Sequence, residues 1–401
     1  MDFGFSSEQE AFRREVQDWL GENMTPEIQE ELEIIDHPAQ RGPHIKELFK
    51  KLGEKGWIGI SWPKEHGGQG GSRLDQYILE EELARVELSG GGGGTGGPAI
   101  MVAGTAEQKE YFLPGLIKGE IIFAAGYTEP SAGADLASLQ CRAVRDGDFY
   151  VINGQKMFTS AANFCTHVYL MCRTDPDAPK HRGISILLVP IDTPGITIRP
   201  LWTIQNNPRA PLGTTYGHAR TNETFFEDVR VPASALLGDE NMGWYIGAGA
   251  LNLDRVGAHR YLISVQRDED VINWAKENRL GDFSLAESPA IRERMVELWI
   301  EAQVCRLMTM RSMSIVEHGG NFTYEGSAEK VWAPEHGVRN AESVSQMFGP
   351  YATLLAGSVG APKDGLYAHQ MMGAFQSGIN HGSVQVMRDQ VARRGLGMPR
   401  G

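Results

Sequence analysis

The sequence lacks several features that mark common classes of protein. It has no basic excess: 38 Lys and Arg stand against 51 Asp and Glu, and the resulting net charge of −13 argues against a nucleic-acid partner. No apolar run approaches the ~20 residues of a membrane-spanning helix. The first five residues have neither the basic nor the apolar region of a secretory signal. We therefore expect a cytoplasmic protein without a membrane span.

Cysteine is also scarce. The four cysteines, Cys141, Cys165, Cys172 and Cys305, show neither CxxC nor zinc-site spacing, so we expect no bound metal. So few thiols, without such a pattern, suit a reducing compartment.

The pattern of apolar residues changes twice along the 401 residues. Residues 1–121 show helical periodicity, as in Ile45, Leu48 and Leu52, and residues 239–401 return to it. Residues 122–238 contain short β-rich runs bounded by Pro and Gly, without helices between them. The order indicates an α+β multi-domain fold with an N-terminal helical domain (1–121), a central antiparallel β domain or small barrel (122–238) and a C-terminal helix bundle (239–401).

A glycine-rich stretch at residues 89–98 has seven glycines among ten residues and a formal GxGxxG at Gly91, Gly93 and Gly96. The preceding residues are helical rather than a strand, and Pro98 follows almost at once, so we do not interpret it as a dinucleotide site. Two interpretations stay open: a flexible loop, and a substrate entrance widened by the missing side chains.

Residues 121–160 combine two strand-and-turn signals. An apolar run ends at Gly126 and is followed by small residues whose main-chain N–H groups can approach a ligand closely. The pair Asn153-Gly154 lies between two β-rich runs, which predicts a hairpin at that point.

The runs 127–135 (YTEPSAGAD) and 153–160 (NGQKMFTS) resemble the flavin-binding signature of acyl-CoA dehydrogenases. Further segments match the family in its own order, at residues 59–68, 104–109, 113–114, 226–232 and 395–400. The resemblance covers essentially the whole chain and implies the family's fold of helical, β and helical domains. The signature is most similar to bacterial members that act as heteromers in steroid side-chain breakdown.

The resemblance implies an FAD site on the central domain. Residues at the positions of Tyr127, Thr128 and Phe158 would lie against the isoalloxazine ring, and Gly133 belongs to the glycine turn beside it. The Ser160 hydroxyl would bond to flavin N5, although an ordinary edge-strand serine is the alternative.

The same resemblance implies that the C-terminal bundle, often of a neighbouring subunit, completes the FAD site. The residues expected there are Arg279 at the pyrophosphate, Gln346 and Gly349 towards the adenine, and Ser383 and Gln385 after the glycine pair. Alternatively, Arg279 is a helix-end charge and Gln346 lies on a solvated face.

The catalytic base falls on Asp254, where one branch of the family has glutamate. His381 occupies the position of the other branch's glutamate and is a second candidate. Asn252 and Arg255 match residues that hold the pantetheine arm and the active-site geometry. Aspartate is one methylene shorter than glutamate, so its carboxylate has to lie closer to the substrate to come within hydrogen-bond reach of the proton it takes. The alternative is that Asp254 only pairs with an arginine on a solvated helix.

The activity implied is FAD-dependent α,β-dehydrogenation of an acyl-CoA thioester to a trans-2-enoyl-CoA, with electrons passed to an electron-transfer flavoprotein. The resemblance also implies a homo- or hetero-oligomer, either a dimer or a tetramer. Two departures keep alternatives open: neither base position holds glutamate, and Ala134 replaces a usual serine or threonine. The alternatives are a non-catalytic partner subunit and a flavin oxidase or monooxygenase.

Overall fold

The computed structural model describes residues 4–35, 37, 39–88, 96–204, 219–254 and 258–399, with the side chains of 249–254 and 258–260 left out. The chain divides into two compact units. The sheet unit comprises residues 19–72 and 90–254, and the bundle unit comprises residues 1–18, 73–89 and 255–401. The boundaries expected at 121 and 238 stay predictions.

The sheet unit is built on one seven-stranded sheet of order β1-β4-β2-β3-β7-β6, with β5 pairing to β4. The strands are β1 (Phe123–Gly126), β2 (Arg142–Asp146), β3 (Phe149–Lys156), β4 (His167–Arg173), β5 (Ile184–Pro190), β6 (Ile196–Leu201) and β7 (Thr221–Pro232). Pairing is antiparallel except where β4 meets β1 and β2. β4 and β5 are buried almost throughout, as expected for strands covered on both faces.

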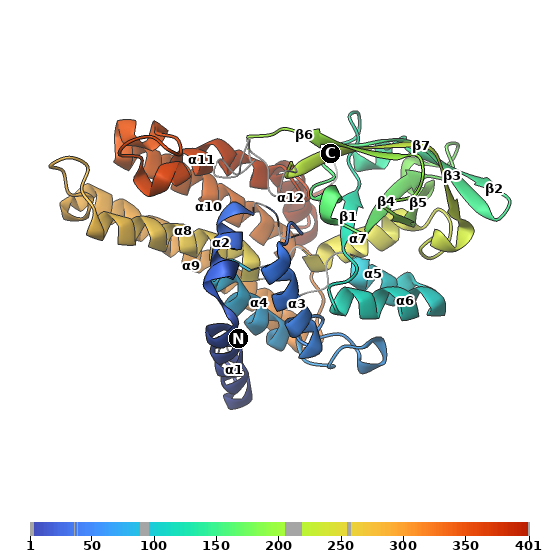
Figure 1. The fold of residues 1–401 in the computed structure, drawn as a ribbon, viewed down its shortest axis with the longest axis horizontal. Coiled ribbons are helices and arrows are strands. Elements are labelled where there is room, and N and C mark those ends of the chain that lie inside the picture. Colours follow the sequence, from blue (N-terminus) through green and yellow to red (C-terminus); the bar gives the residue numbers. More distant parts are fainter. Residues whose placement is uncertain are drawn as a thin grey trace. The chain divides into compact units, whose positions relative to one another are not determined.

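Helices cover one side of this sheet (Figure 1). The helices of the unit are α2 (Pro26–Ile34), α3 (Pro43–Glu54), α5 (Gly96–Ala103), α6 (Ala106–Ile117) and α7 (Gly243–Asp254), together with the end of α1 (Ser7–Asn23). Ile100 of α5 and Leu113 of α6 pack against Tyr169 and Ile186 of the sheet. Thr25 and Thr105 cap α2 and α6, because their side chains accept hydrogen bonds from backbone N–H groups of the first helical turn.

The hairpin expected at Asn153-Gly154 is wrong. The turn between β2 and β3 lies at Gly147-Asp148, where Asp146 pairs with Phe149 and Gly147 has φ +60°. β3 runs straight through Asn153-Gly154, opposite a bulge in β7 at Glu227-Asp228, where Asp228 has φ +48°.

Contacts across the sheet account for this bulge. The Asn153 amide donates to Asp228 Oδ1 (3.0 Å) and its oxygen accepts from Asp228 N (2.9 Å). Gly154 has φ +151°, and a Cβ there would lie 2.7 Å from Cys141 Cα. The Asn-Gly pair is therefore used for close strand approach rather than for a turn.

Residues 89–95 of the glycine-rich stretch lie outside the described residues. Both interpretations of this stretch, as a flexible loop and as a substrate entrance, therefore stay predictions. Gly96 and Gly97 begin α5, where packing explains the absence of side chains. A Cβ would lie 2.5 Å from the Phe123 ring at Gly96 and 2.4 Å from the Trp62 ring at Gly97.

The bundle unit consists of helices, of which α8, α9 and α10 are the longest. They are the start of α1, α4 (Arg73–Arg85), α8 (Ala258–Glu277), α9 (Pro289–Glu317), α10 (Glu325–Phe348), α11 (Leu366–Gly373) and α12 (Val384–Gln390). Leu262, Cys305 and Ala333 join α8, α9 and α10 in one apolar cluster. The expected fold class is confirmed, from the helical N-terminus through the central sheet to the C-terminal helices. Within the described residues, no helix has the length and apolar character needed to cross a membrane.

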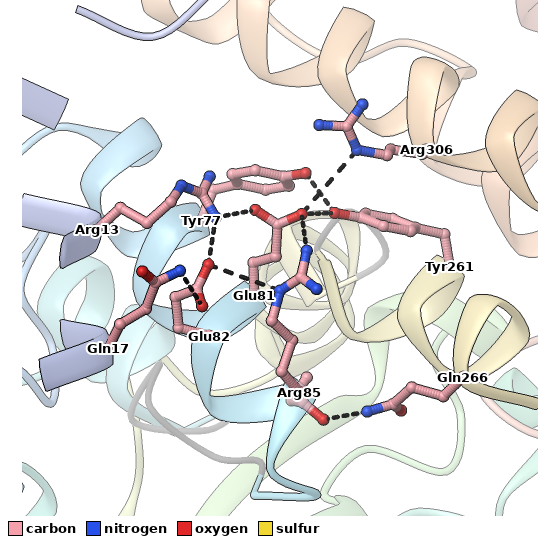
Figure 2. Close-up of polar contacts among 10 residues, drawn as sticks. Arg13, Gln17, Tyr77, Glu81, Glu82, Arg85, Tyr261, Gln266 and Arg306 are labelled. Atoms are coloured by element: carbon pink, nitrogen blue, oxygen red, sulfur yellow. Dashed lines mark hydrogen bonds and ion pairs between the residues drawn. The ribbon is translucent and has the colours of Figure 1, made fainter. Parts of the chain in front are cut away.

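A buried polar network joins α1, α4 and α8 within the bundle unit (Figure 2). Arg13 donates to Glu81 Oε2 (2.6 Å) and also to Glu82. Tyr261 donates to Glu81 Oε1 (2.6 Å) and lies 2.5 Å from the Tyr77 hydroxyl. Two carboxylates that are almost fully buried are thus supplied with donors, as buried charges require.

Candidate active site

The two halves of the predicted flavin signature lie against each other in the sheet unit. Met157 N donates to the carbonyl of Thr128 at 2.8 Å, joining the end of β3 to the loop 127–135. Tyr127 and Thr128 are half-buried, and the Tyr127 ring packs edge-on against Tyr169, with centroids 5.9 Å apart. The loop 127–135 and the residues after β3 therefore lie side by side.

A strained turn at residues 158–161 stands beside this loop. Phe158 and Ala161 both have φ +55°, a left-handed conformation that is uncommon for residues with a side chain. Ser160 N donates to the Phe158 carbonyl (2.8 Å), and the Phe158 ring is 53% exposed. Strained backbone of this kind persists at functional sites where the surroundings hold it in place. Here it presents an aromatic ring next to a serine.

The Ser160 hydroxyl is half-buried and lies 3.3 Å from Thr221 Oγ1 at the start of β7. Either hydroxyl can donate in this pair, so Ser160 can accept from Thr221 while it donates to a ligand atom. A hydroxyl donor beside an exposed aromatic face fits a flat, nitrogen-containing ring such as the flavin.

A buried ion pair holds the loop in place, and sequence reasoning missed its role. Lys156 Nζ lies 2.7 Å from Glu129 Oε1 and donates to the Tyr127 carbonyl at 3.0 Å. Glu129 accepts the backbone N–H groups of Gln140 (2.6 Å) and Cys141 (2.8 Å). The only available signal was a lysine within a β-rich run, because the partner lies 27 residues away.

Gly133 lies exposed on the outer part of the loop. A Cβ there would meet nothing within 4 Å, and its φ is not positive, so neither packing nor backbone conformation requires glycine. The nearby Asp135 carboxylate is paired with Lys180 at 2.7 Å, which lowers its pKa. Approach of a ligand backbone or phosphate to Gly133 stays a prediction.

The residues predicted in the bundle unit fall into two separate groups. Arg279 follows α8, and Gln346 and Gly349 lie exposed at the end of α10. They share one end of the bundle, since Leu280 packs in the same apolar cluster as Phe348. Arg279 is exposed and donates to the Asp282 carbonyl at 2.5 Å.

Ser383 and Gln385 belong to the second group. Ser383 caps α12 by accepting from Val386 N, and Gln385 is exposed. The connection from α8 to α9 forms a far end of the bundle, well away from α12 (Figure 1). One copy of the bundle unit therefore does not bring Arg279 beside Ser383.

The candidate base is described only in part. Asp254 is the last residue of α7, and Asn252 lies in the same helix, but their side chains are outside the described residues. Arg255 is also outside them. His381, the other candidate, is exposed in a turn before α12 and has φ +53°. The base assignment stays a prediction. Within the described part of the chain, no group of His, Cys, Asp and Glu could hold a metal ion.

Comparison with known proteins assigns the family. The acyl-CoA dehydrogenase N-terminal, middle and C-terminal domains match residues 6–120, 124–229 and 241–396. The acyl-CoA dehydrogenase FadE26 of Mycobacterium tuberculosis is 34% identical over 100% of this chain and 99% of its own length. The chain belongs to the acyl-CoA dehydrogenase family.

Solved structures agree with this assignment. The Tcur3481-Tcur3483 steroid ACAD is 34% identical with a TM-score of 0.85, and the ChsE4-ChsE5 complex from Mycobacterium tuberculosis is 33% identical with a TM-score of 0.83. Each comparison covers 100% of both chains. The expected class, an acyl-CoA dehydrogenase oxidoreductase, is confirmed, and members of this family are flavoproteins that generally carry FAD.

Proposed function

We propose that this acyl-CoA dehydrogenase family member binds FAD and converts an acyl-CoA thioester into a trans-2-enoyl-CoA. The strained turn at 158–161, which presents Phe158 and Ser160 beside the loop at 127–135, carries the proposal. Bound FAD would supply the acceptor for the hydride from the β carbon. We also propose that the protein is cytoplasmic, as expected from the sequence.

The chain's own residues would provide the orientation and the proton chemistry. Tyr127, Thr128, Gly133 and Phe158 would hold the ring, and the Ser160 hydroxyl would donate to its N5. Asp254 would take the α-proton, and Asn252 and Arg255 would hold the pantetheine arm. A base must come within about 3 Å of that proton's carbon for efficient transfer.

A second subunit would complete the cofactor site. Arg279, Gln346 and Gly349 lie at one end of the bundle, and Ser383 and Gln385 lie at α12 (Figure 1). An oligomer in which the two groups belong to different copies or different chains would let both contact FAD. The names of the two solved relatives, each a pair of proteins, support a heteromer. An electron-transfer flavoprotein would take the electrons.

The same relatives support a proposal for the substrate class. One is titled a steroid ACAD, which favours an acyl group derived from a steroid side chain over a simple fatty acid. A non-catalytic partner subunit is the second candidate function, because neither base position holds glutamate.

The proposal is tested by purifying the chain alone and together with the proteins encoded beside it. We expect a yellow protein with about one flavin per active site, bleached by steroid-derived acyl-CoAs more than by straight-chain ones. A colourless protein that takes up no FAD in either form would refute the proposal.

Two variants assign the roles. Asp254→Asn should retain flavin but bleach at least about 100-fold more slowly, as expected when a general base is lost. Equal bleaching would instead favour the partner-subunit function or another base. Ser160→Ala should slow bleaching without emptying the site, and unchanged kinetics would contradict its placement at N5.

A further inference from the structure

The Ser160 hydroxyl faces a second hydroxyl within the sheet unit, that of Thr221 at the start of β7. The two oxygens lie 3.3 Å apart, and either can be the donor. Thr221 is 4% exposed, whereas Ser160 is half-buried. The proposed function assigns a role to Ser160 but none to Thr221.

Backbone hydrogen bonds on both sides of the pair fix this arrangement. Thr159 N donates to the Asn222 carbonyl at 2.9 Å, and Ala161 N donates to the Arg220 carbonyl at 2.8 Å. The strained turn is thus joined to the chain that enters β7, and the two hydroxyl-bearing residues lie between these two bonds. Their contact therefore follows from the course of the backbone.

A buried amide next to Thr221 adds to this hold. Asn222 is 0% exposed, and its Nδ2 donates to the Thr159 carbonyl at 3.4 Å. Its Oδ1 accepts from Asn163 Nδ2 at 2.9 Å. Buried polar groups with partners of this kind make a local structure rigid. The distance between the two hydroxyls is therefore determined by contacts on both sides of the pair.

A hydroxyl beside the redox-active nitrogen of a flavin has to change its role when the ring is reduced. Ser160 has to donate to N5 of the oxidised ring, because that nitrogen has a lone pair and no hydrogen. The hydride from the β carbon brings two electrons and forms the N5–H bond, while the α-proton goes to the base. Ser160 then has to accept from N5–H, so its own hydrogen needs another acceptor.

We propose that Thr221 is a positioning residue for the flavin chemistry, which acts through Ser160 and stabilises the reduced ring. Before reduction, Thr221 donates to Ser160 and Ser160 donates to N5. After reduction, N5–H donates to Ser160 and Ser160 donates to Thr221. The reversal requires rotation of two hydroxyl groups and no movement of heavier atoms. The inference rests on the proposed function, because that function places flavin N5 beside Ser160.

Thr221 contributes more to the reduced state than to the oxidised one. Without its hydroxyl, Ser160 still donates to N5 of the oxidised ring and only its oxygen lacks a donor. In the reduced state the Ser160 O–H group would lose its acceptor, and a buried donor without an acceptor is costly. Loss of the Thr221 hydroxyl therefore lowers the equilibrium constant for flavin reduction.

The test compares Thr221→Val, which removes the hydroxyl and keeps the shape, with wild type, Thr221→Ser and the control Thr224→Val. Thr224 lies on the same strand and is 0% exposed, and its hydroxyl has no hydrogen-bond partner among the described residues. The midpoint potential of the bound flavin is measured by titration with a chemical reductant. Flavin content and bleaching by acyl-CoA are measured on the same samples, with the partner subunit present if the protein has one.

We expect Thr221→Val to retain flavin and to lower the equilibrium constant for its reduction at least about tenfold, which for a two-electron couple is a fall of about 30 mV. Thr221→Ser should restore most of the constant, because a serine hydroxyl also donates and accepts. Thr224→Val should match wild type. In a Ser160→Ala background, Thr221→Val should cause no further fall, because Thr221 acts through the Ser160 hydroxyl.

A wild-type potential in Thr221→Val would overturn the inference, and so would an equal fall in the Ser160→Ala background or a folded variant that has lost its flavin. If Thr221→Val does not fold, Thr221→Cys decides by the same criteria, because a thiol is only a weak donor and acceptor. Failure of the proposed function is seen in wild type. If wild type takes up no flavin, the inference fails with it; if wild type is yellow but no acyl-CoA bleaches it, the reductant titration still decides.

Discussion

The buried pair Lys156–Glu129 allows a quantitative prediction about the stability of the loop 127–135 that it holds. The Lys156 side chain is 0% exposed and that of Glu129 is 4% exposed. Lys156→Met removes the ammonium and leaves the carboxylate buried with only two backbone N–H donors. Breaking one side of such a pair costs about 3–5 kcal/mol, because the remaining charge has lost its counterion. With a urea slope of about 3 kcal/mol per M, the unfolding midpoint should fall by about 1–2 M.

The matched control is Lys180→Met, in the same region. Lys180 binds Asp135 at the same 2.7 Å distance, but the two side chains are 60% and 62% exposed. Solvent screens that pair, so we expect no measurable change in the midpoint. The two ion pairs differ mainly in burial, so comparing the two variants isolates the effect of burial on stability.

The double variant Lys156→Met/Glu129→Gln measures the interaction free energy between the two side chains. A neutral glutamine can still accept from Cys141 N, so the double variant should lose about 2–3 kcal/mol less than the sum of the two single variants. Denaturation is followed by tryptophan fluorescence, and flavin content is measured on the same samples, since the Tyr127 carbonyl loses its donor. A Lys156→Met midpoint equal to that of Lys180→Met would refute the reasoning.

Three further predictions concern the sheet unit. Gly154→Ala should destabilise it by more than about 1 kcal/mol in urea unfolding, because the methyl group would lie 2.7 Å from Cys141 Cα; an unchanged midpoint would contradict the bulge geometry. Burial raises the pKa of the Cys141 thiol to about 11 and that of Cys165 to about 12, so both should resist iodoacetamide at pH 7.5 until urea unfolds the protein, and rapid native labelling would count against this burial. Burial lowers the pKa of His167 below its ordinary value of 6.5, so its contribution to stability is present above pH 6.5 and is lost as pH falls below it. His167→Gln should flatten the decline of the thermal midpoint between pH 7 and pH 5, and an equally steep decline would exclude His167 as its source.

Local chemistry accounts for what the sequence predicted well. The buried face of Ile45, Leu48 and Leu52 depends on residues within one or two helical turns. Strand positions followed from short β-rich runs for the same reason. The family resemblance implies the same order of helical, β and helical domains that the periodicity indicates.

Contacts between residues on different strands determined the features that the sequence did not predict. The Asn153-Gly154 pair has the composition of a hairpin turn, yet it lies inside β3, where Asn153 bonds to Asp228 of the β7 bulge and Gly154 closely approaches Cys141. Such partners lie far away in the chain, and their contacts exist only after the sheet has formed. A pattern read over a few neighbouring residues cannot contain them.

The same division holds at the candidate site. The sequence by itself determined which residues belong to the flavin signature, because Tyr127, Thr128, Phe158 and Ser160 stand in two continuous runs. Only the tertiary structure decided how they are held, through the buried Lys156 ammonium and the strained turn that exposes Phe158. The physical reason is that burial strengthens the attraction between a charge and its partner and raises the free energy of desolvating that charge. Burial is a property of the folded chain.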